Sequence, residues 1–289
     1  MANRRMLIAF AHPDDESFGM GGAIARYVAE GVDVYYLCAT NGDVGTVAPE
    51  LLNGYDSVAA LRLAELDKAS QILGFKEVIL LGYKDSGMMH SEFNNDPACL
   101  WQAPLEEVTR RLVEVIRRIK PQVVVTFNKY GGYGHPDHIK IQQATVQAFH
   151  KAGDASYHTD GLAPYAPQKL YYTTIPTFFI RAALGLMRLR RQDPRKAGRN
   201  QDIDIQAILD NVEPTHALVD IRPYFDKQDA ASAAHLSQGG GRIFPLQRVL
   251  RLFLRGQSFT RVHPHPPHDR VDETDLFAGV RLEDTTGAL

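Results

Sequence analysis

The sequence has few residues of the kinds that staple small secreted domains or cross a membrane. Of 289 residues only two are cysteines. Cys38 and Cys99 lie too far apart to suggest a disulfide framework or a cysteine metal site. No run approaches about 18 uncharged apolar residues, the length that a membrane-spanning helix needs. The first apolar run is also too short for a secretory signal. We therefore expect a cytoplasmic protein with free thiols.

An excess of charge of one sign is also lacking. The formal net charge is −2, from 32 Lys+Arg and 34 Asp+Glu, which favours no class of charged partner. The chain shows no extended basic face for nucleic acid and no serine-triad motif. Hydrophobic residues make up 44% of the chain and charged residues 23%. That balance is ordinary for a globular protein whose core needs no disulfides.

Strand-like and helix-like segments alternate along the chain. Such a rhythm predicts an α/β, Rossmann-like fold with a mostly parallel sheet, helices on both faces, and right-handed crossovers. In these folds the active site lies at the carboxyl ends of the strands. We expect one domain over residues 1–240 with a basic insertion at about 176–212, and an extension over 241–289 packed on the same domain. The expected strands are residues 7–11, 32–39, 78–81, 123–127, 169–174 and 217–221, and the longer helices are 57–73, 105–119 and 138–150.

Two clusters of histidine and carboxylate follow strands of this predicted sheet. His12-Pro13-Asp14-Asp15-Glu16 follows the first strand and holds more acids than a helix start needs. His135-Pro136-Asp137-His138 follows the fourth strand after a glycine-rich turn. Catalytic zinc takes three protein ligands from histidine nitrogen and carboxylate oxygen. We therefore expect His12, Asp15 and His138 to bind one Zn²⁺ per chain, with Fe²⁺ or another divalent ion as the alternative.

The two clusters resemble the paired signatures of the LmbE-like, or PIG-L, family of zinc-dependent de-N-acetylases. Similar segments at residues 40–45, 62–65, 85–88 and 234–238 extend the resemblance from about Met6 to Gln238. The family includes deacetylases of N-acetylglucosaminyl-phosphatidylinositol and of mycothiol and bacillithiol precursors. The resemblance implies a metal-dependent hydrolase of a linear amide C–N bond. Its substrate would be an N-acetylglucosamine conjugate, a small molecule, and its products acetate and the free amine.

The resemblance also implies roles for single residues. Asp14 corresponds to the family's general base, which takes a proton from water. Arg62 would reach toward the substrate, although its spacing from Glu65 equally allows a simple pair on one helix face. A tetrahedral intermediate needs hydrogen-bond donors at its oxygen. A cationic His135 and the hydroxyl of Tyr133 are the candidates for that task.

Further residues of the similar segments are expected around the substrate or behind the ligands. We expect Asp137 to orient an imidazole of the second cluster, with an ordinary helix-capping aspartate as the alternative. Asp85 lies after the third predicted strand and is expected to bind substrate. His235 and Gln238 are expected to line the sugar end of the pocket.

Two other functions remain open beside the deacetylase. One is an amidase that cleaves a larger amide, as in the thiol-conjugate amidase of the same family. The other is a non-catalytic module that binds a sugar conjugate. The second alternative predicts loss of the base or of a ligand, and His12, Asp14, Asp15 and His138 are all present.

Two basic stretches stand out against the nearly neutral chain. Residues 181–199 contain seven cations and one acid, Asp193, and residues 248–255 place arginines at i, i+3 and i+7. We favour solvated surface helices for both. The alternative is contact with an anionic conjugate or with an anionic membrane surface. A homo-oligomer is also left open. The cations are Arg181, Arg188, Arg190, Arg191, Arg195, Lys196 and Arg199, and then Arg248, Arg251 and Arg255.

Overall fold

Seven strands form one sheet at the centre of the structure, a computed structural model that describes residues 3–198, 200–241 and 256–282. They are β1 (Arg5–Phe10), β2 (Asp33–Thr40), β3 (Glu77–Tyr83), β4 (Val123–Thr126), β5 (Lys169–Thr173), β6 (Ala217–Val219) and β7 (Gln257–His263). Their order across the sheet is β3-β2-β1-β4-β5-β7-β6. The first five pair in parallel, and β7 is antiparallel to both of its neighbours. The prediction of a Rossmann-like, mostly parallel sheet is confirmed.

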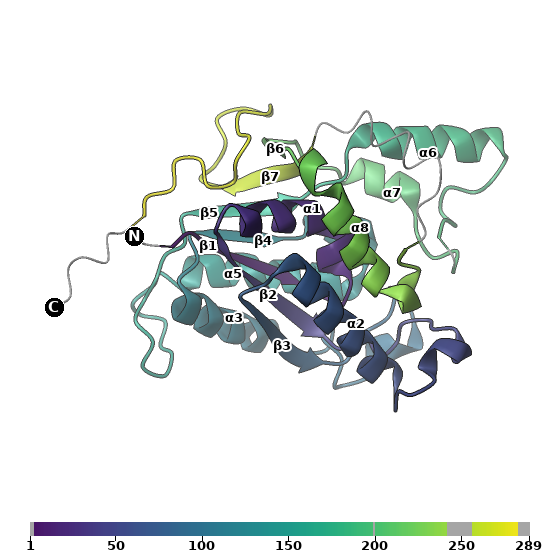
Figure 1. The fold of residues 1–289 in the computed structure, drawn as a ribbon, viewed down its shortest axis with the longest axis horizontal. Coiled ribbons are helices and arrows are strands. Elements are labelled where there is room, and N and C mark those ends of the chain that lie inside the picture. Colours follow the sequence, from purple (N-terminus) through teal and green to yellow (C-terminus); the bar gives the residue numbers. More distant parts are fainter. Residues whose placement is uncertain (1–2, 199, 242–255, 283–289) are drawn as a thin grey trace.

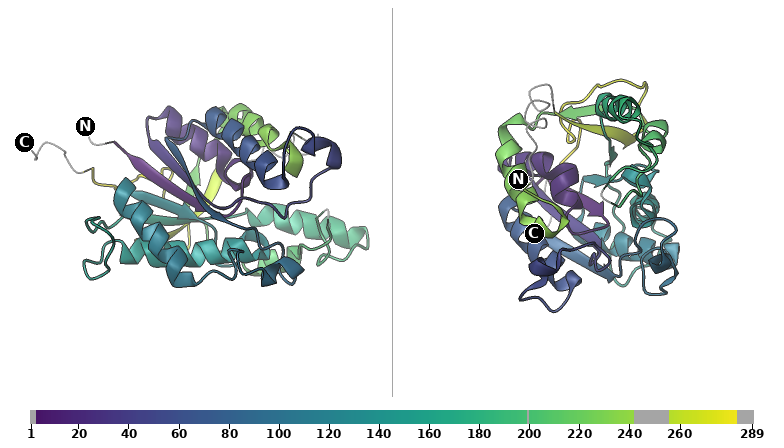
Figure 2. Two further views of the ribbon diagram at one scale, coloured as in Figure 1. Left: turned by 90° about the horizontal axis from the view of Figure 1, so that it is seen from below. Right: turned by 90° about the vertical axis from the view of Figure 1, so that its right-hand side faces the viewer.

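Helices cover both faces of the sheet, as Figure 1 and Figure 2 show. The main ones are α1 (Asp15–Ala29), α2 (Val58–Leu73), α3 (Leu105–Ile119), α5 (Pro136–Lys151) and α8 (Phe225–Ala234). On one face α8 packs against α1 and α2, and on the other α3 packs against α5. The connection through α3 carries the chain from β3 to β4, on the far side of β1. Successive strands are thus added on one side of β1 up to β3 and on the other side from β4 onward. In α/β folds the site lies at the point between β1 and β4 where the strand order reverses in this way.

The local sequence explains where these elements begin and end. The Ser57 hydroxyl accepts a hydrogen bond from the Ala60 amide at 3.1 Å and caps α2. Gly74 ends that helix in the left-handed conformation, with φ 82°. In β1 the residues from Met6 to Phe10 are fully buried, because helices cover both sides of a parallel strand.

The chain after residue 240 contributes to the sheet itself. The sequence predicted only an extension packed on the domain, but β7 lies between β5 and β6 and pairs with both. Phe259 in this strand is fully buried. Lys169 of β5 reaches Glu273 at 2.5 Å, and Arg261 of β7 reaches Asp272 at 2.9 Å. These contacts join the later residues to the central sheet.

A small helical layer stands at one corner of the molecule (Figure 1). It consists of α6 (Thr177–Leu189) and α7 (Ile205–Asp210). Ile180, Leu184 and Ile208 form a small apolar cluster between them. This layer contains most of the predicted basic insertion. Arg199 and the predicted basic helix at residues 248–255 lie outside the described residues.

The remaining helices are short. A turn called α4 (Gly131–Gly134) precedes α5. No helix in the described ranges is long and apolar enough to span a bilayer. In the part of the chain that the structure describes, the 3₁₀ turns are Pro49–Leu52, Glu92–Asn95, Arg222–Tyr224 and Leu236–Gln238.

Candidate active site

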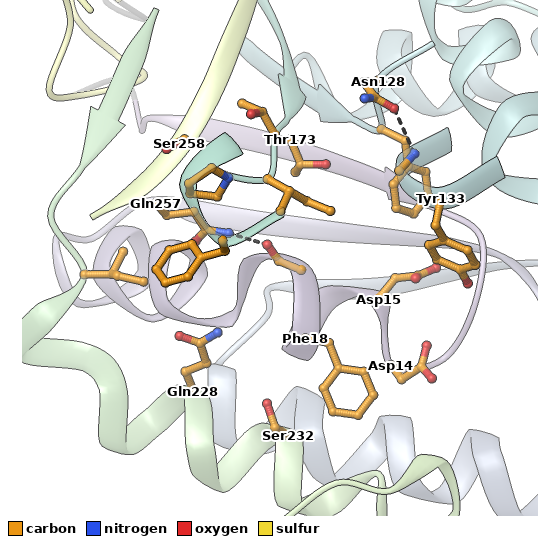
Figure 3. Close-up of a pocket in the computed structure, with 18 of the residues that line it drawn as sticks. Asp14, Asp15, Phe18, Asn128, Tyr133, Thr173, Gln228, Ser232, Gln257 and Ser258 are labelled. Carbon is orange, nitrogen blue, oxygen red and sulfur yellow. Dashed lines mark hydrogen bonds between the residues drawn. The ribbon is translucent and has the colours of Figure 1, made fainter. Parts of the chain in front are cut away.

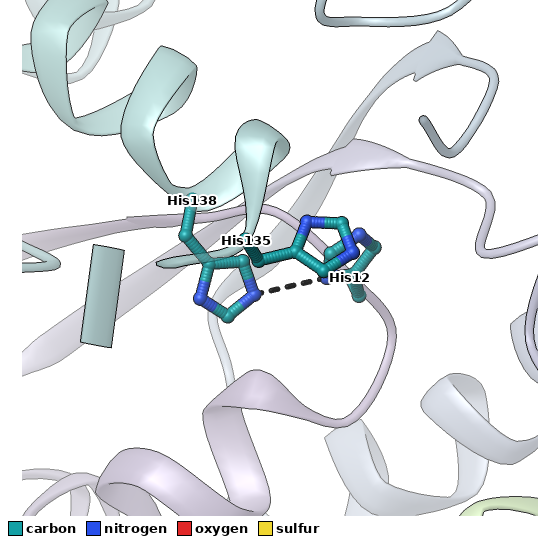
Figure 4. Close-up of side chains that lie close together, drawn as sticks. All are labelled: His12, His135 and His138. Atoms are coloured by element: carbon teal, nitrogen blue, oxygen red, sulfur yellow. Dashed lines mark hydrogen bonds between the residues drawn. The ribbon is translucent and has the colours of Figure 1, made fainter. Parts of the chain in front are cut away.

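The two histidine clusters meet at the carboxyl ends of the neighbouring strands β1 and β4. His12 follows β1, and His138 lies in the first turn of α5, after β4. Figure 4 shows their rings facing each other, with His135 beside them. His12 Nδ1 lies 3.1 Å from His138 Nε2. The fold thus brings together residues that are 126 positions apart.

Asp15 completes a compact group of three ligand-type side chains. Its Oδ2 is 3.5 Å from His12 Nδ1 and its Oδ1 is 3.4 Å from His138 Nε2. Ligands at the corners of a zinc tetrahedron, each about 2.1 Å from the metal, lie roughly 3.4 Å apart. The spacing of these atoms therefore suits one ion bound by His12, Asp15 and His138.

The outer hydrogen bonds of the two rings point to the same conclusion. His138 Nδ1 lies 3.1 Å from the Gly131 carbonyl oxygen, and His12 Nε2 lies 3.2 Å from Asp137 Oδ2. Both oxygens only accept, so these ring nitrogens are assigned the protons. In the neutral rings the facing nitrogens then present lone pairs to each other. Two lone pairs at this distance repel each other, so the contact needs either a proton on His12 Nδ1 or a metal ion bound to both nitrogens.

The electrostatics of the site also favour positive charge. Burial opposes a charged His12, but Asp85, Asp137 and Asp15 together raise its pKa well above the ordinary value. The pKa of His138 is lowered to about 4, chiefly by burial. His138 is therefore neutral at pH 7, as a metal ligand must be.

Asp85 lies inside this group. Its Oδ1 is 3.6 Å from His12 Nε2 and 3.9 Å from His135 Nε2, and its Oδ2 is 3.7 Å from Arg62 Nη1. The expected contact of Asp85 with substrate stays a prediction: its carboxylate lies beside these three side chains and also lines a cavity. Two buried groups are capable of holding a metal ion: His12, His135 and His138, and a second group of His12, Asp85, His135 and Asp137.

The carboxylate of Asp137 is hydrogen-bonded to Ser86, a residue for which the sequence predicted no role. The Ser86 amide donates to Asp137 Oδ2 at 2.8 Å, and the Ser86 hydroxyl donates to Oδ1. Asp137 in turn contacts His12, so it orients an imidazole of the first cluster, not of its own. The position of Ser86 just after β3, at the carboxyl end of a strand, was the feature of the sequence that could have indicated this role.

Asp14 lies beside the ligand group with an unusual backbone, at φ 132° and ψ −27°. Its Oδ2 accepts a hydrogen bond from Arg62 Nη2 at 3.1 Å. Burial raises the pKa of Asp14 to about 7, although the Arg62 charge opposes the rise. A carboxyl group with a near-neutral pKa is able both to accept and to return a proton.

Arg62 was left open between a pair with Glu65 and a role toward substrate. Glu65 instead accepts hydrogen bonds from the Ser237 amide and hydroxyl, at 2.8 and 2.6 Å. Arg62 donates to the Pro13 carbonyl at 2.8 Å and to Asp14. The guanidinium is buried, and it lies along the wall of a cavity. Arg62 therefore holds the loop and side chain of Asp14.

The α4 turn places Tyr133 over the ligand group. Gly132, with φ 73°, allows this turn, and the Tyr133 ring lies 4.9 Å from that of His138. His135 Nδ1 accepts a hydrogen bond from the Asp137 amide at 3.2 Å, which leaves the proton on Nε2. Burial and the charges of neighbouring histidines lower the pKa of His135 well below its ordinary value. The expected cationic His135 is therefore neutral, and its Nε2–H is available as a donor.

His235 does not line a pocket as expected. Its side chain is 0% exposed, and its Nε2 lies 2.6 Å from Glu16 Oε1. Burial opposes charge, but this carboxylate raises the pKa of His235 above its ordinary value. Gln238 does lie at a cavity wall, beside the loop at Gly45. Of these two residues from one short segment, Gln238 lines a cavity and His235 is buried away from it.

Two cavities meet at the site. The larger, of about 1060 Å³, has Asp14, Asp15, Tyr133 and His138 in its wall, together with many apolar side chains. Figure 3 shows Asp14, Asp15, Phe18 and Tyr133 around it. The smaller, of about 470 Å³, is lined by His12, Asp14, Arg62, Asp85, Tyr133, His135 and Gln238 among others.

Comparison with known proteins gives relatives over nearly the whole chain. The family model described as GlcNAc-PI de-N-acetylase, PIG-L, matches residues 7–149. The 1D-myo-inositol 2-acetamido-2-deoxy-alpha-D-glucopyranoside deacetylase of Geodermatophilus obscurus is 35% identical over 96% of this chain and 98% of its own. The enzyme of the same name from Streptomyces griseus is 36% identical over 99% of this chain and 92% of its own.

A solved structure shares the fold. The N,N'-diacetylchitobiose deacetylase from Pyrococcus horikoshii superposes with a TM-score of 0.64 at 22% identity, over 92% of this chain and 88% of that one. At that identity the likeness concerns the fold alone. It places the same α/β sheet in both proteins.

Proposed function

The chain belongs to the PIG-L family of de-N-acetylases and is an enzyme that hydrolyses an N-acetyl amide bond, and from this premise we propose its substrate, its metal and the roles of its residues. The substrate proposed is the 2-acetamido-2-deoxyglucoside of an inositol, the compound named for the relatives. The larger cavity, of about 1060 Å³, has room for both rings of such a conjugate. The products are acetate and the free amine.

We propose that one divalent ion, Zn²⁺ or Fe²⁺, is held by His12, Asp15 and His138. The facing nitrogens of the two histidines, 3.1 Å apart, are the observation that carries this proposal. Such an ion polarises the amide carbonyl and lowers the pKa of water. Asp137 and the Gly131 carbonyl keep the two rings in the tautomers that a metal requires.

The proton transfers fall to Asp14. Its carboxylate takes a proton from the attacking water as the new C–O bond forms. It then delivers that proton to the nitrogen as the C–N bond breaks, so that acetate and the amine separate. Arg62 fixes the orientation of this carboxylate through the 3.1 Å contact. The pKa of about 7 suits both directions of transfer.

Two donors are available for the oxygen of the tetrahedral intermediate. His135 presents Nε2–H while its Nδ1 is tied to the Asp137 amide. Tyr133 lies in the walls of both cavities, and burial raises its pKa far above the ordinary value, so its hydroxyl keeps its proton. Donors that are already in place need no reorganisation during reaction.

Acetate release tests the proposal directly. The metal-loaded protein is incubated with the inositol glucosaminide, with N,N'-diacetylchitobiose, and with an analogue that has a larger acyl group. We expect the highest kcat/KM with the inositol conjugate. A preference for the larger acyl group would establish the amidase alternative instead. Absence of hydrolysis with the whole panel would contradict the proposed substrate class.

A further inference from the structure

The helix α6 has two apolar faces, and the fold uses only one. Ile180 and Leu184 are buried in the cluster with α7. On the opposite side Phe178, Leu186 and Leu189 are 66%, 41% and 81% exposed. Their spacing of eight and then three residues places them on one side of the helix. The outer side of a surface helix is ordinarily polar, so this outer face has no explanation in the fold itself.

Unpaired cations border the outer face along one flank and beyond the end of the helix. Arg181 and Arg188 lie on its border along α6, and further cations follow the end of the helix. All are exposed. Within the residues that the structure describes, none of their side chains forms an ion pair, and Arg188 bonds only to Gln206. The set is Arg181, Arg188, Arg190, Arg191, Arg195 and Lys196.

We propose that α6 docks the enzyme on an anionic lipid surface. Exposed Phe and Leu side chains beside unpaired arginines are the combination that lets a helix lie in the plane of a bilayer interface. The apolar side chains enter the headgroup boundary, and the cations contact lipid phosphates. Figure 1 shows α6 at the edge of the molecule, where a flat surface can reach it. Phe179 of this helix lines the larger cavity, so the membrane would lie beside the active site. This docking goes beyond the proposed reaction and does not depend on it.

Vesicle co-sedimentation tests the docking. The purified full chain is mixed with vesicles of phosphatidylcholine alone and with vesicles that also contain phosphatidylglycerol. We expect binding only to the second kind, with weaker binding as salt rises. Leu186→Ser with Leu189→Ser should reduce partitioning at least about tenfold. Arg188→Glu with Arg190→Glu and Arg191→Glu should reduce it by at least as much.

A matched control has the same charge change elsewhere. Lys68, Lys227 and Arg270 are exposed residues outside α6 and the basic segment after it, and their triple change to glutamate should leave binding nearly unchanged. Equal loss in this control would mean that only net charge matters and would overturn the role of α6. Failure of the wild-type chain to bind anionic vesicles at low salt would overturn it too. So would a dimer that the Leu186 and Leu189 changes dissociate, because the face would then join two copies.

A second inference arises independently, from the backbone of Asp14. With φ 132° this residue has a backbone conformation that residues other than glycine rarely adopt. Its amide donates to Glu16 Oε2 at 3.0 Å. Glu16 Oε1 accepts from His235 Nε2 at 2.6 Å and from the Ser17 hydroxyl at 2.5 Å. Glu16 and His235 are both 0% exposed, so water cannot replace these contacts.

We infer that His235 is a positioning residue: through Glu16 it holds the backbone that presents the base Asp14. The inference rests on the proposed role of Asp14. It gives a task to a buried histidine that touches neither cavity. The same segment after α8 is also held on α2, where the Ser237 amide donates to Glu65.

Two amide variants distinguish the ring nitrogens. In His235→Gln the amide nitrogen reaches the place of Nε2 and is able to donate to Glu16. In His235→Asn it reaches only the place of Nδ1, which has no partner among the described residues. We expect His235→Gln to keep kcat within about threefold of wild type, and His235→Asn to lose about tenfold or more with KM and metal content unchanged.

The crystal structure of His235→Asn supplies a readout that does not depend on activity. We expect Asp14 to leave the region near φ 132° and its contact with Arg62 to lengthen. An unchanged Asp14 backbone, or equal kcat in the two variants, would overturn the inference. If the wild-type chain lacked deacetylase activity, the proposed function would fail, while the crystal structure would still decide whether His235 holds Asp14.

Discussion

The residues proposed as ligands, base and donors at the ends of β1 and β4 differ in what each side chain already contacts. His12 and His138 present ring nitrogens to each other 3.1 Å apart, Asp14 accepts a hydrogen bond from Arg62, and His135 keeps one N–H. These environments differ within a few ångströms. Substitutions of single residues should therefore separate metal binding from chemistry.

Removing a ligand should remove the metal. In His12→Ala or His138→Ala one of the facing nitrogens is lost, and we expect the divalent ion to be absent from the purified protein. Elemental analysis checks this, with His150→Ala as a control because His150 lies at the far end of α5. Full metal content in both ligand variants would refute the assignment.

Removing the base should leave the metal in place. Asp14→Asn keeps the shape of the side chain but cannot accept a proton, so kcat should fall about 10²-fold or more. Metal content should match wild type. Asp15→Asn is the informative comparison, since it should lose the metal as well as activity. An active Asp14→Asn enzyme would show that another group is the base.

Tyr133 offers a test of the oxyanion contact. Tyr133→Phe deletes one hydroxyl, and loss of one such donor costs about 3 kcal/mol of transition-state stabilisation. We expect kcat to fall accordingly and KM to change little. Tyr130→Phe, in the same turn, serves as the control. An effect on KM alone would make the Tyr133 hydroxyl a substrate contact and nothing more.

At the scale of elements, the loop after β2 is shaped by the arginine beneath it. A Cβ atom at Gly42 would lie 2.3 Å from Arg62 Nη1, and Gly42 has φ +66°. Gly31 has a similar φ of +78° but nothing within 4 Å of such an atom. Both glycines are therefore conformationally required, but only one of them touches the site.

This contrast predicts different outcomes for two alanine variants. Gly31→Ala should lose about 1 kcal/mol of stability from backbone strain alone, with normal activity. Gly42→Ala should lose more, and it should lower kcat because Arg62 must move away from Asp14. Urea unfolding and steady-state kinetics of the two variants give the comparison. Equal kcat in both would show that Arg62 adapts without consequence.

At the scale of the whole molecule, the sheet joins the two ends of the chain. β7 lies between β5 and β6, although more than 80 residues separate it from β5. Partly buried ion pairs at Lys169 and Arg261 add to this connection. We therefore expect the chain before and after residue 240 to unfold as one unit.

Phe259 tests that cooperativity. Phe259→Ala removes a fully buried ring from β7 and should cost about 3–5 kcal/mol. Fluorescence and circular dichroism in urea should shift together in a single transition. Val271→Ala, at a position 47% exposed, should change stability little. Two separate transitions in the Phe259 variant would mean that the later residues form an independent unit.

Much of the architecture was predictable from the sequence alone. The apolar runs at 7–11 and 123–127 identified the two central strands, because strands buried on both faces are continuously apolar. The helix expected over residues 57–73 is α2, which Ser57 caps and Gly74 ends. Ligand-type residues directly after two such strands indicated a metal site, since histidine and carboxylate seldom cluster there without a task. The local sequence was thus enough to predict which kinds of residue make up the site.

The partners of those residues were decided only by the tertiary structure. Nothing near Glu16 in the sequence indicates that His235, 219 positions away, holds it. In the same way Arg62 forms its ion pair with Asp14 and not with Glu65, which is three residues away in the sequence. β7 was not predicted, because its short mixture of polar and apolar residues becomes a strand only through pairing with β5 and β6. A local sequence pattern indicates whether a side chain is buried and whether it needs a polar partner. Which distant residue becomes that partner depends on how the helices pack over the sheet.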